Sequence, residues 1–243
     1  MKRETLFDIG IVCGKKEEVL SEIENRLNNG KKTFIVTLNV SIIMEAIKDF
    51  SYKEILKKAD MVIPDGFGIV WALNTVTGVE TDRITGIDTM LYLCEIAKRK
   101  NWKIYLLGAR EKSVKKACEN LKRKGVNVAG YHHGYFEKDN EIIEDIISKK
   151  PDLLFVGMGV PKQEKWIHKH LEKIPVKLAM GVGGSIDVIS GKKKRAPEFI
   201  QRMRLEWFYR FLQSPWNKKK VPFQIAKFIF LVLKEKKKKK RWD

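Results

Sequence analysis

The stretch MVIPDGFGIVW, residues 61–71, joins a short apolar run to a proline, a carboxylate and two glycines. An apolar run of this length that stops at Pro64 is typical of a buried strand, and the apolar residues after Gly68 are compatible with a helix. The stretch therefore predicts a strand that brings Asp65 to its carboxyl end. Two interpretations of this carboxylate are open, because it can cap the following helix or act as an exposed general base.

The same succession of strand and helix recurs along the chain. The runs LFDIGIV, TFIVTLN, KIYLLGA, DLLFVGMG and KLAMGVGG read as strands, and helix-compatible sequence follows each of them. This alternation predicts an α/β fold with a Rossmann-like, mostly parallel sheet and helices on both faces. Ligands of such sheets bind where the strands end. We therefore expect one crevice to be lined by Thr37, Asn39, Asp65, Gly66, Gly108, Gly159, Pro161, Gln163, Gly184 and Asp187.

Two glycine-containing turns are candidates for an anion site. GMGVPKQE, residues 157–164, and GVGGSID, residues 181–187, each follow a strand and open a helix, whose N-terminus favours a diphosphate. The first turn departs from the dinucleotide fingerprint G-x-G-x-x-G, and a plain turn is the alternative for both. We expect Gln163 on the first helical turn with its amide pointing into the crevice. Arg83 is a candidate for neutralising phosphate charge, and a surface arginine is the alternative.

The positive charge is concentrated in the C-terminal segment. The chain has 243 residues and a formal net charge of +19, and residues 192–243 hold 18 Lys and Arg against 4 Asp and Glu, a net of +14. This clustering indicates an anionic partner for the segment rather than general solubility. We expect residues 1–195 to form the α/β domain and residues 196–243 a basic, aromatic-rich helical appendage.

The apolar run VPFQIAKFIFLVL, residues 221–233, suggests the nature of that partner. The run is shorter than the roughly 20 residues of a membrane-spanning helix, but together with the lysines and aromatics it is typical of a segment that lies on a membrane surface. Its continuity argues against nucleic acid, because single-strand binders space their aromatics along a polar groove. Packing of Trp207 and Phe211 against the sheet is a further alternative for the first helix of the segment but not for its last helix. Away from the membrane the apolar run would be hidden by a homo-oligomer, refolding or disorder.

Histidine and cysteine spacing gives no indication of metal or thiol chemistry. The four histidines lack the i, i+4 spacing of helical metal ligands, and there is no D-x-D triplet, so we expect no metal and no cofactor. The three cysteines lie far apart, and the chain opens without an apolar signal segment. These features favour reduced thiols and a cytoplasmic location.

Six motifs in a fixed order resemble the WecG/TagA/CpsF family of bacterial glycosyltransferases. They are TLN, AD followed by PDGFG, RITGID, GMGVPKQEKWI, GVGGSID and RAPEFIQRMRLEWFYRFLQSP. The resemblance as a whole runs from about Leu6 to Pro215. No single motif is specific, but the ordered set is.

The resemblance implies an inverting, metal-independent transfer of a sugar from a UDP-sugar donor to a polyprenyl-diphosphate-linked sugar at the inner face of the cell membrane. In the teichoic acid branch, N-acetylmannosamine would pass from UDP-N-acetylmannosamine to the 4-hydroxyl of undecaprenyl-diphosphate-linked N-acetylglucosamine, giving a β-1,4 linkage. Another donor, such as UDP-glucose or the uronic acid of N-acetylmannosamine, stays open. A binding module without catalysis, for membrane or nucleic acid, is the alternative from another class.

The resemblance also implies roles for the candidate residues. Asp65 would deprotonate the acceptor hydroxyl, while Thr37, Asn39, Arg83 and Gln163 would position the donor. Gly66, Gly108, Gly159, Pro161, Gly184 and Asp187 would line the substrate site. The tail would bind anionic lipid and bring a cation to the diphosphate. Where relatives tend to carry arginines after the SP dipeptide, this chain has WNKKK, and lysine cannot make the bidentate phosphate contact of arginine.

Overall fold

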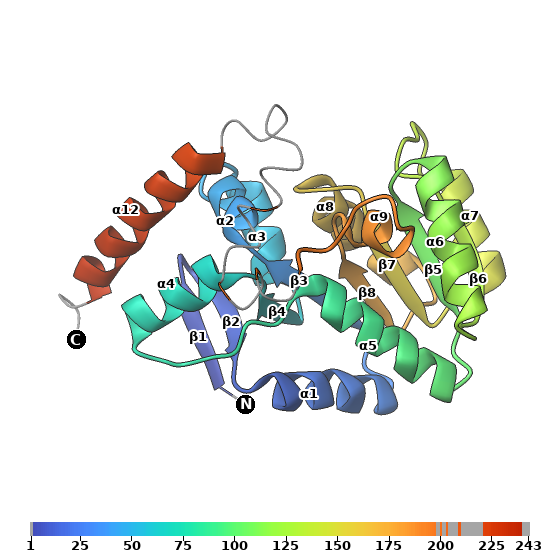
Figure 1. The fold of residues 1–243 in the computed structure, drawn as a ribbon, viewed down its shortest axis with the longest axis horizontal. Helices are drawn as coiled ribbons and strands as arrows, with labels where there is room; N and C mark the ends of the chain where they lie inside the picture. The colour runs from blue at the N-terminus through green and yellow to red at the C-terminus, as the bar shows by residue number, and fades with distance from the viewer. Residues whose placement is uncertain (1, 198–199, 201–202, 204–208, 210–220, 240–243) are drawn as a thin grey trace.

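Six parallel strands form the central sheet of the protein (Figure 1). The computed structural model describes residues 2–197, 200, 203, 209 and 221–239. The strand order across the sheet is β4 (Met61–Pro64), β3 (Thr33–Leu38), β8 (Leu178–Gly181), β7 (Leu153–Gly157), β5 (Ile104–Gly108) and β6 (Val128–His132). Every neighbouring pair in this sheet is parallel, which confirms the predicted α/β class.

Helices cover both faces of the sheet, as Figure 1 shows. Alternate residues of a strand point to opposite faces, so Phe34 and Val36 of β3 join one apolar cluster and Ile35 joins the other. One face packs against α1 (Lys16–Asn28), α5 (Gly86–Arg99), α6 (Glu111–Arg123) and α9 (Ser185–Ile189). The other packs against α2 (Val40–Ala46), α3 (Phe50–Lys57), α4 (Phe67–Thr77), α7 (Asn140–Lys149) and α8 (Lys162–His170), after which a short 3-10 turn spans Leu171–Lys173. Burial on both sides explains why the strands read as continuous apolar runs.

The run LFDIGIV is not the single strand that the sequence predicts. It is divided between β1 (Lys2–Leu6) and β2 (Ile9–Cys13), which pair antiparallel in a separate two-stranded sheet. The residues between them, Phe7 and Asp8, have φ values of 53° and 64°. Two successive positive φ values are typical of a two-residue hairpin turn, and the pattern lacked the glycine that usually marks one.

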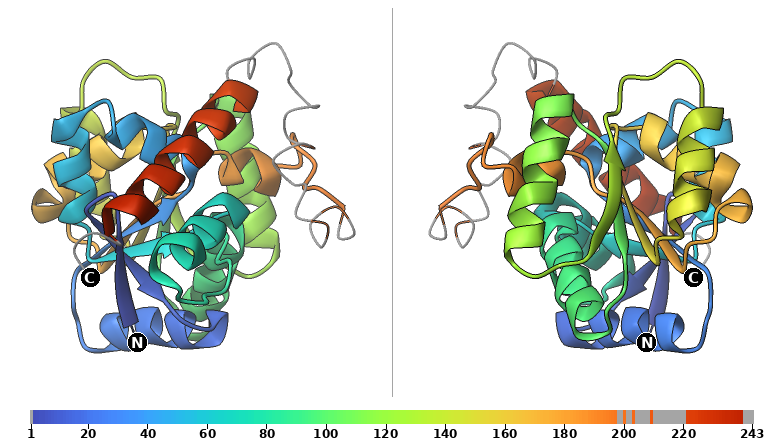
Figure 2. Two further views of the ribbon diagram at one scale, coloured as in Figure 1. Left: turned by 90° about the vertical axis from the view of Figure 1, so that its left-hand side faces the viewer. Right: turned by 90° about the vertical axis from the view of Figure 1, so that its right-hand side faces the viewer.

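The last described helix, α12 (Val221–Lys239), packs against α4 and α2 (Figures 1 and 2). Phe228 and Val232 of this helix are buried in the same apolar cluster as those two helices, and the Phe228 ring lies 6.3 Å from the ring of Phe7. Phe223 and Phe230 are exposed, at 73% and 66%. One face of the helix therefore packs on the domain, while apolar side chains stay outside. The sequence did not predict this contact, because the packing alternative concerned Trp207 and Phe211, which lie outside the described residues.

The tail prediction extends beyond what the structure covers. Most of residues 198–220, with the aromatics and arginines expected there, and residues 240–243 lie outside the described residues. The domain boundary between residues 195 and 196 stays a prediction. Within the part of the chain that is described, no helix combines the length and the apolar character needed to cross a membrane.

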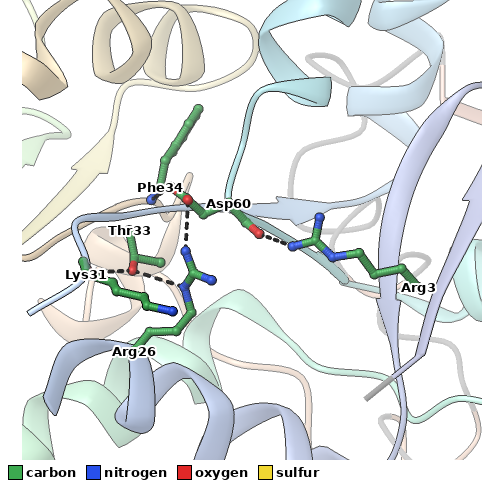
Figure 3. Close-up of polar contacts among 6 residues, drawn as sticks. All are labelled: Arg3, Arg26, Lys31, Thr33, Phe34 and Asp60. Carbon is green, nitrogen blue, oxygen red and sulfur yellow. Dashed lines mark hydrogen bonds and ion pairs between the residues drawn. The ribbon is translucent and has the colours of Figure 1, made fainter. Parts of the chain in front are cut away.

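Asp60 joins four elements at the amino end of β4 (Figure 3). Its carboxylate accepts hydrogen bonds from the Arg26 guanidinium at 2.8 Å and from the backbone N–H of Phe34 at 2.8 Å. Its backbone carbonyl accepts from Arg3, and Arg26 also donates to the Thr33 hydroxyl at 3.3 Å. The acidic residue of the AD motif thus links β1, α1 and β3 to the start of β4. Asp65 lies at the other end of the same strand.

Replacing Asp60 by alanine is expected to lower the free energy of unfolding by about 2 kcal/mol, because two charge-assisted hydrogen bonds are lost and a backbone N–H is left without its acceptor. Urea denaturation measures the change. Glu119→Ala is the matched control, since Glu119 makes an exposed pair with Lys116 at 3.3 Å and its loss should cost at most about 0.5 kcal/mol. Equal effects of the two variants would contradict a structural role for Asp60.

Candidate active site

The predicted site residues lie at the carboxyl edge, which we define as the edge of the sheet where its parallel strands end. Strands β3, β4, β5, β7 and β8 end at Leu38, Pro64, Gly108, Gly157 and Gly181, next to the predicted positions. Two strands, β8 and β7, separate β3 from β5. At about 4.8 Å per strand, β3 and β5 are roughly 14 Å apart, so this edge suits an elongated ligand with several groups.

Two surface cavities lie away from these residues. One, of about 400 Å³, is lined by residues of β6 together with Glu111, Lys122 and Lys149. The other, of about 380 Å³, is lined by residues of α5, α6 and α9 together with Arg195. Neither cavity is lined by a predicted site residue.

Asp65 is held at the end of β4 by the backbone. Its N–H donates to the carbonyl oxygen of Leu38 at 2.7 Å, which continues the pairing with β3. Gly66, with φ of 106°, occupies the N-cap position of α4, and the helix begins at Phe67. The capping alternative placed Asp65 at the start of this helix, but that position belongs to Gly66. The Asp65 side chain is half-buried.

Arg83 is brought beside this turn by the segment that precedes α5. The N–H of Ile84 donates to the carbonyl oxygen of Pro64 at 2.9 Å, so the two chain segments run side by side. The Arg83 guanidinium lies 4.9 Å from the centre of the Phe67 ring. A cation held over an aromatic face keeps a defined position. The tertiary structure therefore brings the segments that carry Asp65 and Arg83 together, although these residues are 18 positions apart in the sequence.

Thr37 and Asn39 both make hydrogen bonds within the protein. The Thr37 hydroxyl, 5% exposed, donates to the carbonyl oxygen of Gly181 at 3.1 Å and so links β3 to β8. The Asn39 side-chain oxygen accepts from the N–H of Ile42 at 3.2 Å and caps α2. Both residues therefore shape the carboxyl edge in addition to any contact with a ligand.

Gly108 is required by the neighbouring strand. Its φ is 140°, and a Cβ atom at this position would lie 2.4 Å from the carbonyl oxygen of Gly157. The N–H of Ala109 donates to that same oxygen at 3.0 Å. The close approach of β5 and β7 thus accounts for this glycine without a ligand.

Gln163 lies on the first turn of α8, after Pro161 at the N-cap, but its amide is not free as predicted. Its side-chain oxygen accepts from the N–H groups of Gly159 at 3.2 Å and Gly183 at 3.0 Å. Its side-chain nitrogen donates to Glu164 at 2.6 Å, and the residue is 2% exposed. The N–H of Gly159 is consequently engaged by Gln163. Gln163 and Glu164 on the first turn of α8 face the protein interior, which a sequence position alone does not reveal.

Asp187 is paired within the chain. Gly184 takes the N-cap position of α9, and Asp187 in the first turn of that helix lies 2.8 Å from the ammonium group of Lys193. Burial raises the pKa of the Asp187 carboxyl, but the hydrogen bond and charge of Lys193 outweigh burial and leave the pKa below its ordinary value. A ribose would therefore meet a carboxylate that already has a partner.

Arg195 and Asp88 form a bidentate pair that the sequence did not predict. The two guanidinium nitrogens lie 2.7 and 2.9 Å from the two carboxylate oxygens, and the Thr85 hydroxyl donates to Asp88 at 2.7 Å. Burial raises the pKa of Asp88, but Arg195 and Thr85 together hold it below its ordinary value. The RITGID and RAP motifs are thereby joined, and the start of the C-terminal segment is held at Asp88, five residues after Arg83. No local pattern reports a contact across this sequence distance.

The three cysteines are free and buried. Burial raises the pKa of Cys13 to about 11 and that of Cys94 and Cys118 to about 12, so these thiols are poor nucleophiles at neutral pH. Among the described residues, no group of three or more His, Cys, Asp or Glu side chains is arranged to hold a metal ion.

Comparison with known proteins gives matches over nearly the whole chain. Residues 4–242 match the model of the glycosyl transferase WecG/TagA/CpsF family. The N-acetylglucosaminyldiphosphoundecaprenol N-acetyl-beta-D-mannosaminyltransferase of Bacillus subtilis (strain 168) is 34% identical over 243 residues, covering 99% of this chain and 94% of the relative. Proteins of the same name from Bacillus spizizenii and Staphylococcus aureus (strain MW2) are each 35% identical over 237 residues, covering 96% and 97% of this chain and 92% of each relative. The chain therefore belongs to the WecG/TagA/CpsF family of glycosyl transferases.

Proposed function

We propose that this protein transfers N-acetylmannosamine from UDP-N-acetylmannosamine to undecaprenyl-diphosphate-linked N-acetylglucosamine, forming a β-1,4 linkage. The relatives that carry this activity in their names align over at least 92% of their own length. The observation that carries the proposal is the half-buried Asp65 carboxylate at the end of β4, with Arg83 beside it. A base and a cation at one point of the edge are what a glycosyl transfer from a nucleotide donor requires.

The reaction proceeds as a single displacement. Asp65 takes the proton of the acceptor 4-hydroxyl, and the oxygen attacks the anomeric carbon from the side opposite to UDP. The bond from the anomeric carbon to the β-phosphate oxygen breaks, and its electron pair leaves with UDP. Attack from the opposite side inverts the anomeric configuration. Arg83 balances the charge that develops on the leaving diphosphate, without a metal ion.

The other predicted residues form the walls of the site. Thr37 and Asn39 fix the end of β3 near the donor sugar, through the hydrogen bonds to Gly181 and Ile42. The nucleotide lies along the ends of β5, β7 and β8, where Gly108, Gly159, Pro161, Gly184 and Asp187 are found. The N–H of Gly159 already donates to Gln163, so it does not donate to the nucleotide. The loop contacts the nucleotide through its other atoms.

The experiment that tests this function follows UDP release from UDP-N-acetylmannosamine with a lipid-diphosphate N-acetylglucosamine acceptor, in EDTA. Turnover in EDTA, with a β-anomeric proton in the NMR spectrum of the product, is the expected result. Turnover that needs a divalent ion would contradict metal independence. UDP release only from UDP-glucose or from the uronic-acid donor would replace the proposed sugar. Release from none of these donors would contradict the assignment, and salt-sensitive binding to nucleic acid would then support a binding module.

The acceptor is a membrane lipid, and α12 is suited to bring the protein to the inner face of the membrane. Exposed apolar side chains at Phe223, Phe230 and Leu233 lie beside the lysines of residues 234–239. Aromatic and apolar side chains insert at the headgroup boundary, while lysines attract anionic lipid. The protein is accordingly proposed as a peripheral membrane protein without a nucleic-acid partner. Self-association through the same face is the alternative.

Replacing both Phe223 and Phe230 by serine is expected to weaken binding to anionic vesicles about tenfold or more, because two large apolar groups no longer enter the interface. Vesicle flotation at several lipid concentrations measures the loss. Tyr135→Ser is the matched control, since Tyr135 is equally exposed, at 70%, on the loop after β6. Unchanged flotation of the double variant, with a smaller oligomer in sedimentation, would favour self-association over membrane binding.

A further inference from the structure

The carboxylate of Glu164 is buried, and the proposed reaction does not use it. Glu164 lies in the first turn of α8 and is 0% exposed. One of its oxygens accepts from the side-chain nitrogen of Gln163 at 2.6 Å, and the other accepts from the hydroxyl of Tyr52 at 2.9 Å. Tyr52 comes from α3 and is also 0% exposed. A buried carboxylate is costly unless its oxygens are hydrogen-bonded, and here two donors meet them.

This carboxylate determines which way the amide of Gln163 points. An amide has a donor end and an acceptor end of nearly the same shape, so its neighbours decide the orientation. Gly159 and Gly183 each present an N–H donor to Gln163, whereas Glu164 presents an acceptor. Only one orientation satisfies all three contacts, with the oxygen toward the glycines and the nitrogen toward Glu164.

The oriented oxygen connects two loops of the carboxyl edge. Gly159 belongs to the loop between β7 and α8, and Gly183 to the loop between β8 and α9. Both glycines have positive φ, 81° and 51°, so their N–H groups point in directions that regular backbone would not give. By accepting from both, Gln163 sets the spacing of the loops between which the proposed nucleotide lies.

We propose that Glu164, held by Tyr52, is a positioning residue: it orients the Gln163 amide, which holds the Gly159 and Gly183 loops at the spacing that binds the UDP part of the donor. This inference rests on the proposed function for the identity of the ligand. It differs from the role first expected for Gln163, because neither Gln163 nor Glu164 needs to touch the substrate.

Exchanging the two side chains tests the orientation directly. Gln163→Glu alone sets two carboxylates against each other at the 2.6 Å contact and should weaken UDP binding at least tenfold. The double variant Q163E/E164Q restores the pattern, since the new amide donates to position 163 and accepts from Tyr52, while the new carboxylate accepts from both glycines. UDP binding of the double variant, measured by calorimetry, should return to within about fivefold of the native value. Independent roles would make the double variant weaker than either single variant.

Hydrogen exchange of the backbone amides reports on the hydrogen bonds from Gly159 and Gly183 to Gln163 and needs no ligand. The amides of Gly159 and Gly183 should exchange at least tenfold faster in Q163E and regain their protection in the double variant. Tyr52→Phe should raise the exchange rate of both amides by a smaller factor and weaken UDP binding about threefold. Tyr105→Phe is the matched control, because the buried Tyr105 also donates to a carboxylate, that of Asp145, at 2.7 Å, and it should leave both readouts unchanged.

A failure of the proposed nucleotide site and a failure of the positioning role of Glu164 give different results. If native protein binds no UDP, the proposed nucleotide site is wrong, while the exchange rates still test the orientation of Gln163. If native protein binds UDP and the double variant remains as weak and as unprotected as Q163E, the positioning role of Glu164 is wrong. Protection lost in Q163E without a change in UDP affinity would also overturn it, because the loops would then not govern binding.

Discussion

Replacing Asp65 by asparagine is expected to lower kcat roughly 10²- to 10⁴-fold, the range that a positioned general base contributes. Asparagine keeps the size of the side chain and its place at the end of β4, but it cannot take the proton of the acceptor hydroxyl. The donor KM and the affinity for UDP should change little, because the base acts on the acceptor. Initial rates of UDP release in EDTA, with donor and acceptor varied in turn, separate these quantities.

The control for this variant is Glu80→Gln, which neutralises an exposed carboxylate on the segment that leads to Arg83. It should leave kcat within about twofold of the native value, as expected for a surface substitution. Equal turnover of native protein and Asp65→Asn would show that Asp65 has a structural role at the turn before α4. The base would then have to be sought among other carboxylates of the chain.

Replacing Phe228 by alanine is expected to lower the free energy of unfolding by about 3–5 kcal/mol, the range for removing a buried aromatic ring. Phe228 is 2% exposed and lies between Phe7 and α4, where a Cβ atom on Gly68 would come 3.7 Å from its ring. The loss should appear in urea or thermal unfolding. Because α12 packs on α4, and the turn with Asp65 leads directly into α4, turnover should fall as well.

Phe230→Ala serves as the matched control, since Phe230 lies on the same helix and is 66% exposed. Its effect on unfolding should stay within about 0.5 kcal/mol, although vesicle binding should weaken. If the two variants unfolded alike, α12 would not pack on the domain in solution. The exposed and buried aromatics of this helix thus separate membrane binding from stability.

The sequence by itself determined the class of the fold and the edge of the sheet at which the candidate site residues lie. Apolar runs that stop at proline or glycine predict buried strands, and the helical patterns between them require the strands to be parallel. Once the strands are parallel, the residues after each run must meet at one edge, so Asp65 and Asn39 are expected at the same edge without any knowledge of the coordinates. The family motifs, read in order, agree with the match over residues 4–242.

Only the tertiary structure decided what each polar side chain at that edge contacts. Asp60 and Asp65 are close in sequence, but the five residue steps along β4 separate them by roughly 16 Å and place them at opposite ends of that strand. Gln163 lies on the predicted turn, yet its amide is engaged in hydrogen bonds with Gly159, Gly183 and Glu164. Hydrogen bonds of this kind depend on distance and direction between groups far apart in the chain. Local periodicity records burial but not the direction of a polar group, which is why the Glu164 carboxylate and the pair of Asp88 and Arg195 became visible only in the folded molecule.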